Sequence, residues 1–104
     1  MGSPDIWYKA CLKNFAKNLS EQNYYKDIEQ MSETELEIYI SKKRLETSEP
    51  TFYYMAGIAA DQTVRTAYKI SCDDLNTAAG SLCMFEDFIE LEPEIINWGD
   101  KYGY

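Results

Sequence analysis

The first twenty residues repeat apolar side chains with the spacing of an α-helix. Ser3 suits the N-cap position, and Pro4 suits the first helical position after it. Apolar side chains recur at three- and four-residue steps on one face: Trp7, Tyr8, Cys11, Leu12, Phe15, Ala16 and Leu19. Three lysines at positions 9, 13 and 17 fall on a separate face. This pattern predicts an amphipathic helix.

The middle of the chain predicts three more helical segments. Residues 20–30 indicate a short helix or helical loop. Ser32 and Glu35 fit a capping box at the start of a helix that ends near the basic residues 42–44; a short strand over 37–40 is the alternative. The segment 51–70 is the most apolar, so we expect it to be the central buried helix. Its internal Gly57 is expected to permit close helix packing.

The last third predicts two helices separated near Pro93. Asp73 or Asp74 is expected to cap a helix whose apolar positions run to residue 89. Pro93 then predicts a separate short helix that ends at Gly99. Residues 1–4 resemble a cloning remnant with an N-cap, and we expect a frayed tail over 100–104. Together the segments predict one domain over 1–104, an all-α compact bundle of four to five amphipathic helices.

Composition excludes several classes of protein. The chain has 104 residues, of which 45% are hydrophobic, so it can form one core and is not disordered. It lacks the roughly 18-residue apolar run of a membrane span. It has no histidine, which removes His-based triads and bases, and it has no phosphate-binding loop. We therefore expect a protein that is not an enzyme, with no catalytic residue, no cofactor and no metal site.

Negative charge is concentrated near the carboxyl end. The formal net charge is −8, and residues 70–104 contain eight acids but one base, Lys101. Such a field repels nucleic acids and membrane surfaces and attracts basic clefts; ordinary solubility is the alternative explanation. We expect partner-binding residues here, namely Asp73, Asp74, Glu86, Asp87 and Glu90. Each of the tyrosine doublets at 24–25 and 53–54 is expected to place one ring in the core and one outward.

Three cysteines, Cys11, Cys72 and Cys83, cannot all pair within the chain. A bridge from Cys11 to either of the others requires the fold to bring helices together. Three buried, reduced thiols are the alternative. The start of the sequence as given carries no export signal.

The segment 52–97 resembles part of a known family. Its aromatic-small-glycine stretch at residues 54–59, Cys72, the amphipathic run 75–88 and the Pro-containing exit 91–94 resemble helical immunity proteins against type VI secretion amidase effectors. The family has a proline two residues after the cysteine, where this chain has Asp74. The resemblance implies a periplasmic inhibitor that occludes the cleft of its toxin, with a Cys11–Cys72 disulfide; a chain with three reduced thiols would be cytoplasmic.

The sequence thus predicts a non-catalytic inhibitor or immunity protein. Its partner is expected to be a protein (a toxin, effector or host enzyme) with a basic or cationic-rimmed cleft, rather than a nucleic acid or a membrane. A phage-type anti-restriction or anti-CRISPR protein that mimics nucleic acid is the alternative function. A homodimer is a further arrangement that the sequence leaves open.

Overall fold

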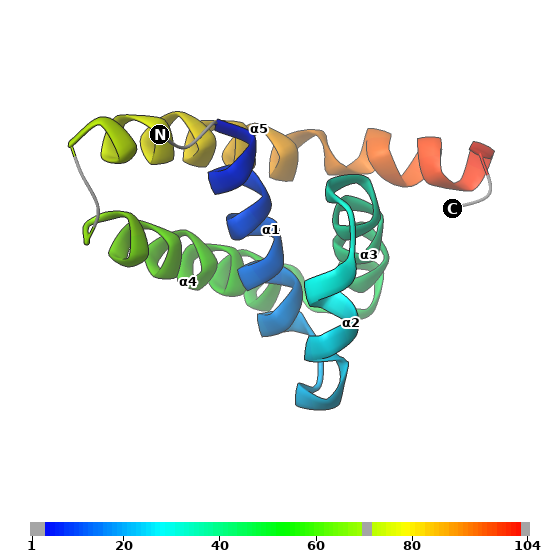
Figure 1. Ribbon diagram of the computed structural model, residues 1–104. Coiled ribbons are helices and arrows are strands. Elements are labelled where there is room, and N and C mark those ends of the chain that lie inside the picture. Colours follow the sequence, from blue (N-terminus) through cyan, green and yellow to red (C-terminus); the bar gives the residue numbers. More distant parts are fainter. Residues whose placement is uncertain (1–3, 70–71, 103–104) are drawn as a thin grey trace.

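The protein is an all-α bundle, seen in Figure 1 as a computed structural model. The structure describes residues 4–69 and 72–102, with side chains described over 6–69 and 75–91. In these ranges the elements are α1 (Pro4–Leu19), η1 (Gln22–Tyr24), α2 (Tyr25–Gln30), α3 (Glu33–Glu46), α4 (Glu49–Ala67) and α5 (Cys72–Tyr102). The five α-helices confirm the predicted fold class. The strand considered for residues 37–40 is wrong, because they lie within α3.

Helix α1 is the centre of the bundle. It packs against α2, α3, α4 and α5, and in Figure 1 it crosses the long α4 and α5. The expectation that the 51–70 segment is the central helix is therefore wrong. Only one stripe of α4 is buried. Three of its five buried residues are alanines, which contribute little buried area. The larger side chains of α1 fill the space between the other helices.

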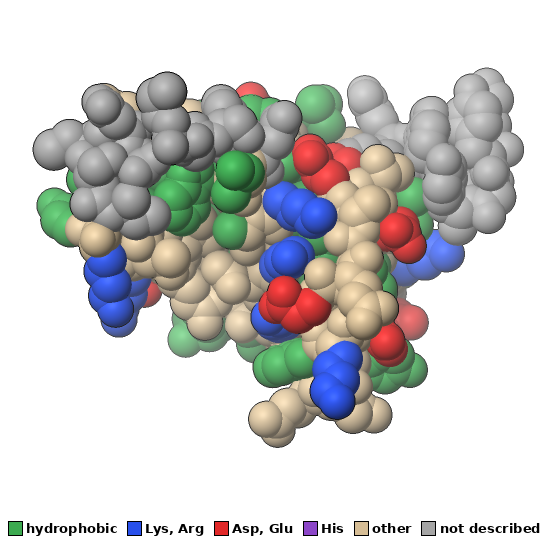
Figure 2. All heavy atoms as spheres, in the orientation of Figure 1, with side chains coloured by type: hydrophobic (Ala, Val, Ile, Leu, Met, Phe, Trp, Pro, Cys, Tyr) green, Lys and Arg blue, Asp and Glu red, His purple; other side chains and the backbone are tan. Residues whose placement is uncertain are grey.

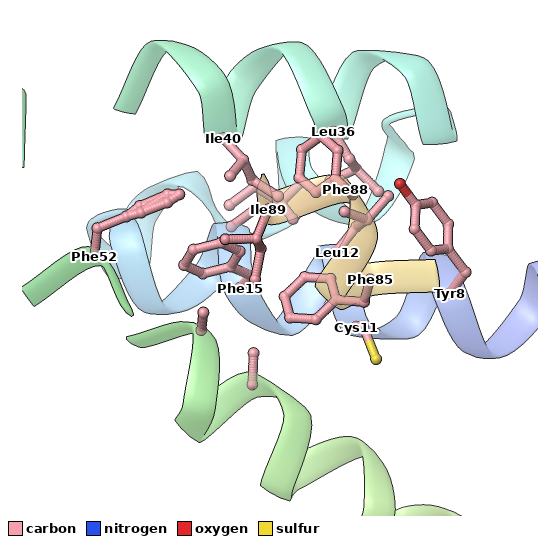
Figure 3. Packing of buried hydrophobic residues seen from close by; sticks show 14 residues of the cluster. Tyr8, Cys11, Leu12, Phe15, Leu36, Ile40, Phe52, Phe85, Phe88 and Ile89 are labelled. Carbon is pink, nitrogen blue, oxygen red and sulfur yellow. The ribbon is translucent and has the colours of Figure 1, made fainter. Parts of the chain in front are cut away.

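The core is built around Phe15 of α1. Its ring makes edge-to-face contacts with Phe52 of α4 and Phe85 of α5, at centroid distances of 4.8 and 5.5 Å. Figure 3 shows these three rings lying together with Leu12, Ile40 and other side chains. Phe15 and Phe52 are fully buried and Phe85 is 1% exposed. Burial of each such side chain stabilises the fold by about 1.5–3 kcal/mol, and each aromatic pair adds about 1 kcal/mol.

Local signals set the helix boundaries much as the sequence predicts. The Ser32 hydroxyl accepts a hydrogen bond from the Glu35 amide at 3.2 Å, and the Glu35 carboxylate accepts one from the Ser32 amide at 3.1 Å. This is the predicted capping box, and α3 begins directly after it. Helix α4 has Pro50 in its first turn, where a missing N–H costs no helical hydrogen bond.

Helix α5 continues through Pro93, so the predicted break there and the predicted end at Gly99 are wrong. Residues 100–102 belong to the helix and 103–104 lie outside the described residues, so the predicted frayed tail over 100–104 stays a prediction. A proline within a helix leaves the carbonyl four residues earlier without its usual donor, and here that carbonyl belongs to Ile89. The Nη1 of Arg44, on α3, donates to the Ile89 oxygen at 3.3 Å. A neighbouring helix thus supplies the hydrogen bond that proline cannot.

Candidate functional site

A groove with a volume of about 300 Å³ lies between α4 and α5. Its described lining comes from two helices: Tyr53, Ala56, Gly57 and Ala60 of α4, and Phe85, Glu86, Ile89 and Glu90 of α5. We call it the α4–α5 groove. The small residues Gly57 and Ala60 make the α4 side of the groove shallow. The edges of the buried Phe85 and Ile89 on α5 form an apolar floor. The groove therefore joins an apolar surface to two acidic side chains.

The groove brings together two of the five predicted partner-binding residues. Glu86 and Glu90 are exposed and line it. They are four residues apart on α5, which places them on the same side of the helix. Asp87 is exposed on α5 next to Glu86 but does not line the groove. The side chains of Asp73 and Asp74 lie outside the described residues.

The carboxylates of Glu86, Asp87 and Glu90 make no hydrogen bond or ion pair within the described part of the chain. Some other acids are paired with a cation. Glu29 accepts from both Lys13 and Lys17 of α1, which lowers the pKa of Glu29, and Asp61 pairs with Arg65 at 2.9 Å. On the face shown in Figure 2, basic and acidic side chains alternate over α1 and α2. Glu86 and Glu90 differ from Glu29 and Asp61 in having no described cation bound to them.

Gly57 opens the groove and does not serve helix packing. A Cβ built at Gly57 meets no atom within 4 Å, so the predicted role of this glycine in close packing is wrong. The residue is exposed and lines the groove. Any larger side chain at this position would occupy space in the groove without meeting the core.

Arg44 fixes the Tyr53 end of the groove. Its Nη2 donates to the Tyr53 hydroxyl at 3.0 Å, while its Nη1 donates to the Ile89 carbonyl. The guanidinium also lies over the rings of Phe52 and Tyr53, 5.0 and 5.4 Å from their centroids. One cation of α3 therefore binds both walls of the groove, and Glu86 lies about one helical turn along α5 from that end.

Both tyrosine doublets differ from the expectation. Tyr24, Tyr25, Tyr53 and Tyr54 are all exposed, at 48, 37, 43 and 68%. The buried stripe of α4 contains Phe52 instead, and successive residues point about 100° apart around a helix. Tyr53 lines the groove, and Tyr54 is the next residue of α4 and is also accessible. The sequence showed that Tyr53 and Tyr54 are adjacent, but it did not show that the neighbouring Phe52 occupies the core.

A second polar contact lies inside the bundle, away from the groove. The hydroxyl of the buried Tyr8 donates to Glu37 Oε2 at 2.8 Å, and Figure 3 shows Tyr8 pointing toward α3. Burial, followed by its contacts with Glu37, raises the pKa of Tyr8 above its ordinary value. Burial raises the pKa of Glu37, although the hydrogen bond from Tyr8 acts in the opposite direction. This pair joins α1 to α3.

Two of the three cysteines are described, and both are free thiols. Cys11 is fully buried and Cys83 is exposed. Burial raises the pKa of the Cys11 thiol, against a smaller opposing effect of its hydrogen bond with Thr63. The implied Cys11–Cys72 disulfide would need a bridged Cys11, whereas Cys11 is a free thiol in this structure; the side chain of Cys72 lies outside the described residues.

Neither a metal centre nor a membrane span is found in the described part of the chain. No three Cys, Asp or Glu side chains there are placed to hold a metal ion, and no helix there is long and apolar enough to cross a bilayer.

Comparisons with family models, curated proteins and solved structures find no match to this chain. The geometry of the α4–α5 groove is therefore the main guide to function.

Proposed function

We propose that this protein is a non-catalytic inhibitor that binds a protein partner through the face formed by α4 and α5. The observation that carries the proposal is the α4–α5 groove, where an apolar floor, an exposed Tyr53 and two carboxylates meet. Aromatic side chains beside an apolar pocket are typical anchors of protein interfaces. Tyr54 and Asp87 follow Tyr53 and Glu86 in sequence and are exposed as well.

The partner is expected to present a basic or cationic-rimmed surface. A formal net charge of −8 attracts a positive partner at long range. Close to contact, Glu86, Asp87 and Glu90 lie within five residues of one helix and are exposed. Exposed charges of this kind increase the association rate more than they increase the affinity. Association should therefore slow as salt is added.

We further propose that the partner is a bacterial toxin or effector, so that the protein acts as an immunity protein. This step rests on the resemblance of residues 52–97 to the immunity proteins of type VI secretion amidase effectors. That stretch includes every described residue that lines the groove. Occlusion of the partner's active-site cleft needs only a tight complex, and no chemistry by this chain. A periplasmic location belongs to the same proposal.

The test compares two triple charge reversals in affinity capture from a lysate of the source organism. One variant carries Glu86→Lys, Asp87→Lys and Glu90→Lys. The control carries Glu21→Lys, Asp27→Lys and Glu46→Lys, which reverse three exposed acids outside α4 and α5. Both variants have the same formal net charge, so a loss confined to the first identifies the α4–α5 face and not overall charge.

Function is then tested on the captured protein. Expression of that protein should arrest growth, and coexpression of the wild-type chain or the control variant should restore it. The first variant should restore growth less well. Equal capture by both variants would refute the α4–α5 face. A captured protein that is harmless, or whose activity the wild-type chain does not reduce, would refute an inhibitory function.

A further inference from the structure

We infer that the α4–α5 groove receives an arginine side chain of the partner. This inference rests on the proposed function and names the chemistry that the groove recognises. An arginine joins an aliphatic stem to a planar cation, and the groove presents the matching pair of surfaces. Its floor is apolar at Ala56 and Phe85, and its rim carries the carboxylates of Glu86 and Glu90.

Charge complementarity selects a cationic guest. Glu86 and Glu90 have no described cation bound to them, although they lie on the side of α5 that faces the groove. The one described cation that touches the groove walls is Arg44, which is held at the Tyr53 end by its contacts with Tyr53 and Ile89. A guest cation is therefore directed away from Arg44 and toward Glu86.

The floor and wall favour arginine over lysine. A guanidinium is less strongly hydrated than an ammonium and can stack on an aromatic face. Arg44 already shows this behaviour within the chain, since its guanidinium lies over both Phe52 and Tyr53. A guanidinium also has enough donors to contact two carboxylates at once, and Glu86 and Glu90 are one turn apart. A partly enclosed, apolar-floored groove therefore suits a guanidinium best.

The first experiment uses small probes on the isolated full chain. Amide chemical shifts are recorded by NMR during titration with butylguanidinium, guanidinium, butylammonium and butylurea. We expect butylguanidinium to shift the amides of Gly57 and Glu86 and to leave that of Gly80, which does not line the groove. Guanidinium lacks the stem and butylurea lacks the charge, so both should bind more weakly. Equal binding of butylurea would overturn a charge-selective groove, and equal binding of butylammonium would overturn the choice of arginine.

The second experiment blocks the groove. Gly57→Leu places a side chain inside it, and Gly80→Leu makes the same change on α5 outside it; a Cβ at either position meets nothing within 4 Å. Both variants should fold, because leucine is a better helix former than glycine. Butylguanidinium binding should be lost in Gly57→Leu and kept in Gly80→Leu. Binding that survives in a folded Gly57→Leu protein would overturn the inference.

The third experiment removes the charge without filling the groove. Glu86→Gln combined with Glu90→Gln keeps the shape of both side chains and should weaken butylguanidinium binding about fivefold, as expected for an exposed ion pair. Unchanged affinity would overturn the role of the two carboxylates. If none of the probes binds, the arginine inference fails. Partner capture through the α4–α5 face would still stand, so the two proposals can fail separately.

Discussion

The hydrogen bond from Arg44 to Ile89 should depend on the presence of Pro93. Replacing Arg44 by Met keeps an unbranched apolar stem and removes the guanidinium with its donors. The bond to the Ile89 oxygen, 3.3 Å long, comes from a charged donor and contributes about 1.5–3 kcal/mol. Stacking over aromatic rings at a partly exposed site contributes about 0.5–1 kcal/mol more. We expect Arg44→Met to lower the free energy of unfolding by about 2–4 kcal/mol.

Replacing Pro93 by Ala changes this cost. The alanine would supply an N–H to the Ile89 oxygen, so the helix would satisfy its own carbonyl. In that background Arg44→Met should still lose the contacts that do not involve Pro93, namely the stacking contribution of about 1 kcal/mol and the exposed hydrogen bond to the Tyr53 hydroxyl. The coupling energy between positions 44 and 93 should therefore be about 1.5–3 kcal/mol, taken from the hydrogen-bond share alone. Contacts of Arg44 that do not involve Pro93 cancel in this comparison.

The assay is urea unfolding of the four proteins, followed by circular dichroism at a helical wavelength. Lys42→Met is the matched control, because Lys42 is an exposed cation of the same helix. It should cost less than about 0.5 kcal/mol in both backgrounds. If Arg44→Met costs the same in the wild-type and Pro93→Ala backgrounds, within about 0.5 kcal/mol, then Arg44 does not replace the missing donor.

Three further predictions concern the core, pH and thiols. Phe15→Ala should lower the free energy of unfolding by about 3–5 kcal/mol in urea melts, because Phe15 is fully buried; a loss under about 1 kcal/mol would contradict its central place. Burial raises the pKa of Glu37 in the folded state, so its ionised form destabilises the fold above that pKa. Glu37→Gln, which can still accept from Tyr8, should stabilise the protein at neutral pH, and this advantage should shrink as pH falls through the raised pKa; melts at several pH values test it. Iodoacetamide should alkylate the exposed Cys83 of the native protein and spare the buried Cys11, as mass spectrometry can show.

Local patterns predicted the elements because their causes are local. The period of apolar residues from Trp7 to Leu19 placed one face of α1 in the core. The capping box at Ser32 depends on residues three positions apart. Such signals lie within one helix, so they are readable before any tertiary contact is known.

Features that depend on contacts distant in sequence could not be predicted. Continuation of α5 through Pro93 involves Arg44, which is 45 residues from the carbonyl it contacts. Hydropathy likewise made the 51–70 segment the expected centre, although α1 carries the larger buried side chains. Glu86 and Glu90 were found from charge and spacing. The α4 wall of the groove could not be predicted in the same way. The exposure of Gly57 depends on which stripe of α4 faces the core, and the sequence pattern alone does not decide this.

Arg44 fixes one end of the α4–α5 groove, whereas the end at Glu86 has no such contact. This difference affects how a partner would bind. At one end Arg44 ties Tyr53 to the Ile89 carbonyl, which lacks its usual donor because of Pro93. That end is therefore preorganised, which reduces the entropy lost when a partner contacts Tyr53. At the other end Glu86 is exposed and free of described contacts, so it can adjust to an approaching cation. A guest that first meets Glu86 by electrostatic attraction and then packs against the fixed Tyr53 would use the adjustable end for encounter and the rigid end for affinity.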